Sequence, residues 1–342
     1  MGTVVRPTWI RALVRALGFA LVSLTPCEPA AAGCKLVKLA ELPVTMRGRP
    51  SVPVSINGHT TSMIVDTGSW KTMIWRPAAA SLDLKLTSAH MTNYGAGGED
   101  SVDRVRVRDF TLAGYTVHDF DMYAAGRGQA GEAAGFIGED LLSRIDVEFD
   151  LQAGAIRLFT PEGCQGDQVV YWAASYSMVP LLRPPGNTNW PVANVSVNGH
   201  EALALFDSGA SNSTITTSAI KRPGMSPENT PTSAGSGRGI AGKAFATDIA
   251  TFETVTVGQE SVQHAQLMIA DLSNRTIRTG SLIPQDVVGN PDLLEREPDL
   301  ILGADFFLAH RIYIARSQKK LYFTYRGGPL FQPRVPQQVT KP

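Results

Sequence analysis

The stretch Ile64-Val65-Asp66-Thr67-Gly68-Ser69 decides the fold, because it returns as Leu205-Phe206-Asp207-Ser208-Gly209-Ala210. Each copy follows an Asn-Gly dipeptide, at residues 57–58 and 198–199. The aspartates and the dipeptides share one offset, since 207 − 66 = 141 and 198 − 57 = 141. Self-similarity at a fixed offset indicates a repeated structural unit. The 342-residue chain therefore contains two copies of one unit.

A second motif follows each copy and supports the repeat. Two apolar residues, Gly, any residue and Asp occur at 136–140 and at 301–305, where the offset is 303 − 138 = 165. The second copy is thus longer, by 165 − 141 = 24 positions. We assign much of this excess to 271–299, a polar stretch without clear periodicity that predicts a surface insertion.

Within each copy the pattern favours β-structure. An Asn-Gly dipeptide between short alternating runs is the strongest local signal for a hairpin. Residues 145–151 alternate apolar and acidic side chains, which predicts a half-buried strand. Helix is expected only in short pieces, at 140–144 and 305–310. The prediction is an all-β chain with short helices.

Residues 1–32 have the order of a secretory signal peptide. A start with three arginines precedes the nine-residue apolar run 16–24, and Ala30-Ala31-Ala32 supplies small residues for cleavage. The run is too short for a membrane helix, which needs about 20 residues. We expect a periplasmic or secreted protein without a membrane span after cleavage. An uncleaved N-terminal anchor is the alternative.

Cleavage after residue 32 would leave two of the three cysteines, Cys34 and Cys164. In an oxidising compartment an even number of cysteines favours a disulfide, which would join the two ends of the first half. Two buried free thiols are one alternative. A lipid anchor on Cys34 is another, since residues 31–34 resemble a lipoprotein box.

The paired aspartates, Asp66 and Asp207, are candidates for catalysis. Two carboxyl groups facing one water can hydrolyse a peptide bond, one taking the proton of the water and the other polarising the carbonyl. Like charges in contact cannot both ionise, so such a pair shares one proton. Aspartic proteases are the standard example of this behaviour. The alternative is that each Asp merely caps a turn.

The residues around each Asp suit such a site. Gly68 and Gly209 allow close backbone approach. Thr67 and Ser208 have hydroxyls that can bond across the base of the site. The two halves differ in one further respect, because Ser69 can donate to a carboxylate whereas the side chain of Ala210 cannot.

With these motifs the chain resembles the bacterial retropepsin-like aspartic peptidases, with two units fused in tandem over about residues 40–160 and 186–326. The resemblance implies an acid-protease (retropepsin/pepsin-like) fold of two pseudo-symmetric β-barrel lobes. It implies Asp66 and Asp207 as catalysts, and Thr67 and Ser208 as the grip between the loops. It also implies that a supporting loop forms around each motif glycine, Gly138 and Gly303.

The resemblance also sets the two lobes and the substrate-binding elements, while composition marks the linker and the Pro-rich tail. We expect a first lobe at 33–163, a linker at 164–185, a second lobe at 186–326 and a Pro-rich tail at 327–342. Retropepsin-like units cover their substrate with glycine-tipped hairpin flaps, which points to Tyr94, Gly95, Gly97 and Gly98 and, in the second half, to Gly237, Gly239 and Gly242.

Other functions are less well supported. Equal numbers of basic and acidic residues, 31 of each, argue against a nucleic-acid partner. We expect no cofactor and no metal, since the six histidines lack metal-ligand spacing. Asp140 and Asp305 are expected to cap short helices. The expected protein is a monomeric endopeptidase that acts on peptides or proteins. The rivals are a non-catalytic peptide-binding protein on the same fold and a structural protein of the cell envelope.

Overall fold

The computed structural model describes residues 34–95, 98–126, 128, 133–164, 166–183, 189–239, 244–272 and 297–332. The predicted signal segment 1–32, Gly97 and Gly242 lie outside these residues. So do most of the predicted insertion 271–299 and most of the tail 327–342.

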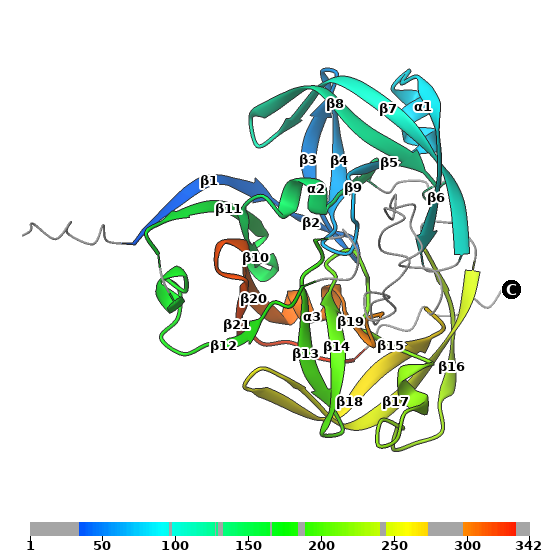
Figure 1. Cartoon of the computed structure of the whole chain (residues 1–342), viewed down its shortest axis with the longest axis vertical. Helices are drawn as coiled ribbons and strands as arrows, with labels where there is room; N and C mark the ends of the chain where they lie inside the picture. The colour runs from blue at the N-terminus through cyan, green and yellow to red at the C-terminus, as the bar shows by residue number, and fades with distance from the viewer. Residues whose placement is uncertain are drawn as a thin grey trace, which may run out of the picture. The chain divides into compact units, whose positions relative to one another are not determined.

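The first lobe is a closed barrel of six strands (Figure 1). The hydrogen-bonded order is β3-β4-β9-β5-β8-β7, and pairing of β3 with β7 closes it. The short strand β2 and the edge strand β6 extend the same sheet. The strands are β2 Thr45–Met46, β3 Pro50–Ile56, β4 His59–Val65, β5 Met73–Trp75, β6 Leu86–Gly95, β7 Gly98–Leu112, β8 Tyr115–Ala125 and β9 Gly135–Ile137.

The second lobe repeats this topology strand for strand. Its order is β13-β14-β19-β15-β18-β17, closed by pairing of β13 with β17, and β16 is the edge strand. The repeat detected in the sequence is thus a repeat of the fold. The strands are β13 Val192–Val197, β14 His200–Phe206, β15 Thr214–Thr216, β16 Thr232–Arg238, β17 Ala244–Val257, β18 Glu260–Ala270 and β19 Leu300–Leu302.

The two predicted hairpins open the two barrels. Ile56 pairs with His59 across the first turn, and Val197 pairs with His200 across the second. In both turns the Asn and the Gly have positive φ, 51° and 85° in the first and 51° and 77° in the second. Asn and Gly tolerate this backbone region best, which explains the repeated dipeptide.

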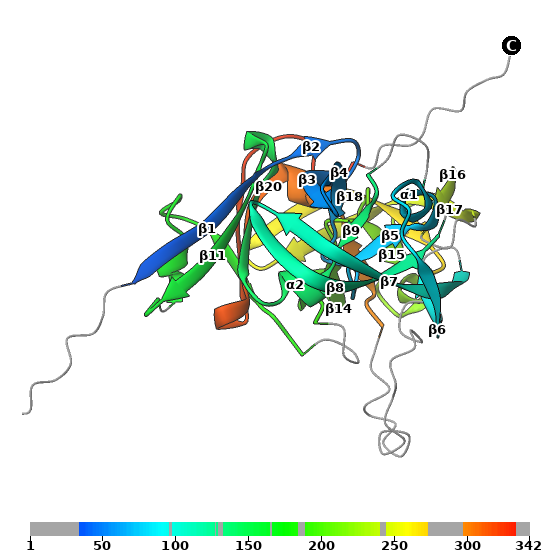
Figure 2. The same ribbon diagram turned by 90° about the horizontal axis from the view of Figure 1, so that it is seen from above.

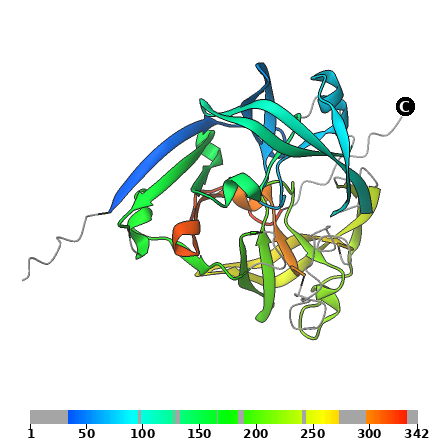
Figure 3. The ribbon, with the colours of Figure 1, turned by 45° about the horizontal axis from the view of Figure 1, so that its top comes forward.

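A third sheet contains strands from both halves of the chain, in the order β1-β11-β10-β20-β21-β12. Figures 2 and 3 show β1 running alongside β11. At its centre β10 pairs antiparallel with β20, so the two units are hydrogen-bonded to each other. The strands are β1 Lys35–Pro43, β10 Asp146–Asp150, β11 Ala155–Glu162, β12 Ser177–Pro180, β20 His310–Ala315 and β21 Lys320–Tyr325.

Helices are short, as predicted. The α-helices are α1 Arg76–Ser81, α2 Glu139–Leu142 and α3 Ala304–Ala309, and the 3-10 turns are Leu151–Ala153, Gly166–Val169, Ala219–Lys221 and Arg316–Gln318. The stretch predicted as a linker contains Gly166–Val169 and β12. Among the described residues, no helix is long and apolar enough to cross a membrane.

The prediction of a half-buried strand at 145–151 is wrong, because β10 is buried on both faces. Its acidic residues remain buried through contacts with the neighbouring strand β11 and with the second half of the chain. Glu148 accepts from Arg157 and Arg311, at 2.5 and 2.9 Å. Asp146 accepts from the backbone N–H of Ser317 at 2.9 Å. Buried charges persist only when paired. Two of these partners, Arg311 and Ser317, lie 163 and 171 residues away in sequence.

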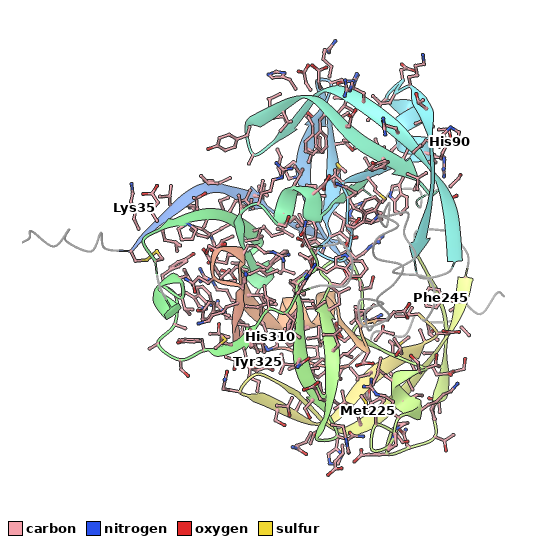
Figure 4. The ribbon with its side chains drawn as sticks, viewed as in Figure 1. Lys35, His90, Met225, Phe245, His310 and Tyr325 are labelled. Atoms are coloured by element: carbon pink, nitrogen blue, oxygen red, sulfur yellow. A yellow bond between two sulfur atoms is a disulfide. The ribbon has the colours of Figure 1, made fainter. Side chains whose placement is uncertain are left out.

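The core of the second lobe includes a fully buried histidine, His310, which the sequence did not single out. Its Nδ1 lies 2.8 Å from the carbonyl oxygen of Phe306 and its Nε2 lies 2.9 Å from Glu260 Oε2. Its ring lies 5.6 Å from that of Tyr325, the residue it faces across β20 and β21 (Figure 4).

The predicted disulfide between Cys34 and Cys164 is present. It ties the chain just before β1 to the chain just after β11, and these two strands pair along their length. A sulfur in a disulfide cannot also carry a thioether-linked lipid, so the structure favours the disulfide over the lipid-anchor and free-thiol alternatives.

Candidate active site

The two motif aspartates occupy equivalent places at the ends of buried strands. Asp66 follows β4, and its amide donates to the carbonyl of Ile137 at 3.0 Å. Asp207 follows β14, and its amide donates to the carbonyl of Leu302 at 2.9 Å. In each lobe the strand before the Asp runs parallel to the strand that carries the apolar-apolar-Gly motif, β9 or β19. The repeated motifs therefore meet in space.

Each aspartate lies directly against the glycine of the other lobe. A Cβ atom built on Gly68 would lie 2.3 Å from Cγ of Asp207, and one built on Gly209 would lie 2.1 Å from Cγ of Asp66. No side chain fits at such distances. The approach of the opposite carboxyl group therefore requires glycine at both positions. The sequence predicted a close backbone approach at these glycines but not the group that approaches.

Backbone amides fix the orientation of each carboxyl group. Gly68 donates to Asp66 Oδ1 at 2.9 Å. Gly209 and Ala210 donate to Asp207 Oδ1 at 2.8 and 3.0 Å. The hydroxyl of Ser69 donates to the carbonyl of Lys71 at 2.8 Å instead of to a carboxylate. The two halves do differ, but the difference comes from the backbone amide of Ala210, which gives the Asp207 carboxyl group one more hydrogen bond than Asp66 receives.

The environment favours one shared proton. Burial raises the pKa of Asp66 well above its usual range, and repulsion by Asp207 adds to this, while the charge of Arg49 opposes it. Burial also raises the pKa of Asp207, while the hydrogen bonds that it accepts from Asp66 and from backbone amides oppose this rise. Both residues are nevertheless half-buried, so solvent reaches the pair. Two adjacent carboxyl groups in such surroundings retain a proton that an exposed pair would lose.

A network of buried hydroxyls joins the two loops beneath the aspartates. Thr67 Oγ1 donates to the carbonyl of Phe206 at 2.6 Å and accepts from the Ser208 amide at 3.0 Å. Ser208 Oγ donates to the carbonyl of Val65 at 2.6 Å and accepts from the Thr67 amide at 3.2 Å. Thr67 and Ser208 are 1% and 0% exposed, so water cannot replace these bonds. The network holds the two loops at a fixed separation.

The motif glycines support the loops from below. A Cβ on Gly138 would lie 2.4 Å from the backbone carbon of Lys71, and one on Gly303 would lie 2.6 Å from that of Asn212. Each glycine therefore allows its strand end to contact the backbone of the neighbouring loop that carries Asp66 or Asp207. A larger residue would move that loop and the aspartate it carries.

Asp140 and Asp305 do not cap helices, contrary to the prediction, since neither short helix has a side-chain cap. Asp140 instead accepts from the amide and hydroxyl of Thr72, both at 2.8 Å. Asp305 accepts from the hydroxyl of Ser213 at 2.8 Å. These contacts brace the far end of the loops that carry Asp66 and Asp207.

Thr72 and Ser213 were missed by the sequence reasoning, although a signal for them exists. They are related by the offset of the repeat, since 213 − 72 = 141. Both are fully buried, and their hydroxyls accept from the amides of Gly138 and Gly303, at 3.2 and 3.1 Å.

Each lobe carries a long hairpin at the predicted flap position (Figure 1). Tyr94 and Gly95 end β6, and Gly95 pairs with Gly98 at the start of β7. In the second lobe Gly237 lies within β16 opposite Phe245, and Gly239 follows the strand. The flap role of these residues stays a prediction.

A group of aromatic side chains adjoins the loop that carries Asp66, and the sequence reasoning also missed it. Trp70, four residues after Asp66, stacks on Tyr123 with ring centroids 5.8 Å apart. Trp75 meets Phe136 edge-on at 4.6 Å. These side chains belong to one apolar cluster of the first lobe. Within the described residues, no group of three or more His, Cys, Asp or Glu is arranged to hold a metal ion.

Comparison with known families agrees with this geometry. The sequence model described as aspartyl protease matches residues 52–141 and 193–306, one stretch in each lobe. The chain belongs to the aspartyl protease family. The two matches contain both Asp-Thr/Ser-Gly motifs and both apolar-apolar-Gly motifs. The chain is thus a retropepsin/pepsin-like aspartic peptidase by family, with two units in one chain.

Among solved structures, the aspartic proteinase from Irpex lacteus is similar to this aspartyl protease. The two are 14% identical, with a TM-score of 0.49, and the match covers 85% of this chain and 97% of the other. No curated protein matches the sequence.

Proposed function

We propose that the protein is an aspartic endopeptidase in which Asp66 and Asp207 activate a water molecule. The observation that carries the proposal is the placement of each half-buried carboxyl group against the glycine of the opposite loop. Family membership supports the same reaction class.

In the proposed reaction the pair begins with one proton. The ionised carboxylate takes a proton from water, whose oxygen attacks the carbonyl carbon of the scissile bond. The protonated carboxyl group donates to the carbonyl oxygen, so a neutral tetrahedral intermediate forms. The carboxyl group that took the proton of water then donates it to the amide nitrogen, while the other carboxylate takes a proton from one hydroxyl of the intermediate. The C–N bond breaks, a carboxylic acid and an amine leave, and the singly protonated pair is restored. Hydrogen bonds from the backbone amides of Gly68, Gly209 and Ala210 keep the two carboxyl groups oriented throughout.

The test compares Asp66→Asn and Asp207→Asn with the wild type on a diverse peptide mixture read by mass spectrometry. Each variant is expected to lose cleavage while it stays folded, because one remaining carboxyl group cannot act as both acid and base. Asp119→Asn, at an exposed position, is the matched control and should retain activity. Substantial cleavage by either folded active-site variant would refute the assignment.

The same experiment separates the rival function. If the protein is instead a non-catalytic peptide-binding protein, the wild type would also bind peptides without cutting them. Binding without cleavage over the whole pH range would therefore favour that rival, in which peptides add to the sheet edges as extended strands.

We further propose that the active species is a monomer, since one chain supplies both aspartates and β10–β20 pairing joins its halves. Specific activity should not change on dilution, and a fall that parallels a dimer-to-monomer shift would argue against a monomer.

We propose an extracytoplasmic location, which the disulfide favours because such bonds persist in oxidising compartments. Fractionation of the native cells tests it.

A further inference from the structure

Arg76 connects the first helix to the first hairpin. It begins α1, directly after β5, and α1 lies beside the β6–β7 hairpin (Figure 1). Its Nη1 donates to Asp100 Oδ2 at 2.7 Å, and its Nε donates to Asp103 Oδ2 at 2.9 Å. Its Nη2 donates to the carbonyl and to the hydroxyl of Ser101. All three nitrogens of the guanidinium group therefore bond to residues 100–103 of β7.

These bonds lie where the hairpin leaves the sheet. The pairing of β7 with β8 begins at Asp103, which faces Ala124. Residues 98–102 of β7, the projecting part, pair with β6 alone among the described strands. An isolated two-stranded hairpin is at best marginally stable in water, so its direction depends on support from outside the hairpin. Arg76 provides such support at Asp100 and Ser101, within the projecting part.

The network also includes the chain that follows β8. The amide of Gly126 donates to Asp100 Oδ2 at 2.6 Å, and the amide of Arg76 donates to the carbonyl of Gly126 at 3.4 Å. The side chains of Arg76, Asp100 and Asp103 are 26, 24 and 25% exposed, so solvent screens their charges only in part. Hydrogen bonds between charged groups are stronger than neutral ones, and the planar guanidinium holds several acceptors in one fixed geometry.

The base of the projecting part packs beside the loop that carries Asp66. Val102 is 2% exposed and belongs to the same apolar cluster as Ile64 and Phe136. Ile64 lies two residues before Asp66 and pairs with Phe136 of β9. The direction of the first hairpin is therefore tied to the part of the barrel that holds Asp66.

In the part of the chain that the structure describes, the second hairpin has no equivalent network. Pairing of β17 with β18 begins at Thr247, so residues 244–246 project with β16 alone. The offset of the repeat places Thr217 at the position of Arg76, since 217 − 76 = 141. The Thr217 hydroxyl donates to a carbonyl of β18 at 3.5 Å, and Phe245 of the projecting residues packs on the facing strand β16 (Figure 4). The two hairpins are therefore held differently.

We propose that Arg76 is a positioning residue, which holds the first hairpin in the orientation that closes over a substrate bound at Asp66 and Asp207. The proposal rests on the proposed endopeptidase function and on the predicted flap role of the hairpin. A hairpin that is already ordered in the unbound enzyme loses less conformational entropy when the substrate binds. Removal of the Arg76 guanidinium should therefore weaken substrate binding more than it slows the chemical step.

The kinetic test measures kcat and KM of Arg76→Gln on a peptide that the wild type cleaves. KM is expected to rise about tenfold, which corresponds to about 1.4 kcal/mol, while kcat stays within about threefold. Arg76→Lys keeps the charge but not the planar fork, so its KM should lie between those of Arg76→Gln and the wild type. Asp100→Asn should also raise KM, and the double variant should be no worse than Arg76→Gln alone, because both changes remove one contact.

Hydrogen exchange read by mass spectrometry follows the hairpin itself. In Arg76→Gln the amides of β6 and of residues 98–103 should exchange faster than in the wild type. The amides of β16 and β17 should be unchanged, since the second hairpin does not contact this network. Arg106→Gln is the matched control, because Arg106 of β7 also bonds an aspartate, Asp121, at 2.8 Å, but outside the projecting part. It should change neither KM nor the exchange of the hairpin.

A KM within twofold of the wild type in folded Arg76→Gln would overturn the positioning role and leave the endopeptidase function standing. So would an equal effect of Arg106→Gln, or a lower urea midpoint without any change in KM or exchange. If Arg76→Gln does not fold, Asp100→Asn breaks the same contact and decides between these outcomes. If the wild type cleaves no peptide, the proposed function and the substrate-positioning role fail together, and the exchange experiment still shows whether Arg76 orders the hairpin.

Discussion

Replacing Ser208 with alanine tests whether the buried hydroxyl network holds together the two loops that carry Asp66 and Asp207. The Ser208 hydroxyl, 0% exposed, donates to the carbonyl of Val65 at 2.6 Å and accepts from the amide of Thr67 at 3.2 Å. The alanine variant would leave both backbone groups without this partner in a region that excludes water. Each buried group left unsatisfied costs about 1–3 kcal/mol.

The expected loss in the free energy of unfolding is therefore about 2–4 kcal/mol, since Thr67 Oγ1 still bonds Phe206 and the Ser208 amide. Urea unfolding followed by tryptophan fluorescence measures this loss, and kcat/KM on a peptide that the wild type cleaves measures the effect on the site. Ser208→Thr keeps the hydroxyl, as the first lobe does with Thr67, and should remain near the wild type.

Ser261→Ala is a second control, because it removes an exposed hydroxyl that accepts from Thr256 and should cost less than about 0.5 kcal/mol. If Ser208→Ala and Ser261→Ala destabilise the protein equally, the hydroxyl network does not hold the loops together.

Buried contacts give three further predictions. Gly209→Ala should abolish cleavage in a folded protein, because the new methyl group would occupy the place of the Asp66 carboxyl group; kcat/KM within threefold of the wild type would contradict this. Burial raises the pKa of Glu139 to about 8, although Arg316 pairs with it. Folding therefore favours its protonated form, and its contribution to stability is lost as the pH rises from about 4.5 to about 8. Glu139→Gln should gain stability relative to the wild type between pH 5 and pH 8, whereas a constant difference in urea midpoint would exclude the effect. The disulfide closes a separation of 130 residues, so Cys34→Ser with Cys164→Ser should lose up to about 4–5 kcal/mol. An unchanged urea midpoint would show that the bond contributes nothing.

Local sequence predicted the hairpin turns that open the two barrels, because a turn depends on neighbouring residues. The turn at residues 57–58 needs positive φ at two positions, and Asn-Gly supplies it. The same rules failed for Asp140 and Asp305. A carboxylate early in a short helix is usually read as a cap, yet here it accepts from a hydroxyl 68 or 92 residues away. Nothing local to the helix signals that partner.

The sequence by itself determined the doubled unit, the all-β class and the candidate pair Asp66 and Asp207, because repeated spacing and turn chemistry are local properties. Only the tertiary structure decided which charges are buried and which reach the site. The acids of β10 are inside because Arg311 and Ser317 come from the other half of the chain. The positive charge of Arg49 opposes the rise in the pKa of Asp66, and the turn that carries Arg49 lies next to Ser211 of the second lobe. Such contacts depend on how two barrels pack, and no single stretch of sequence records that arrangement.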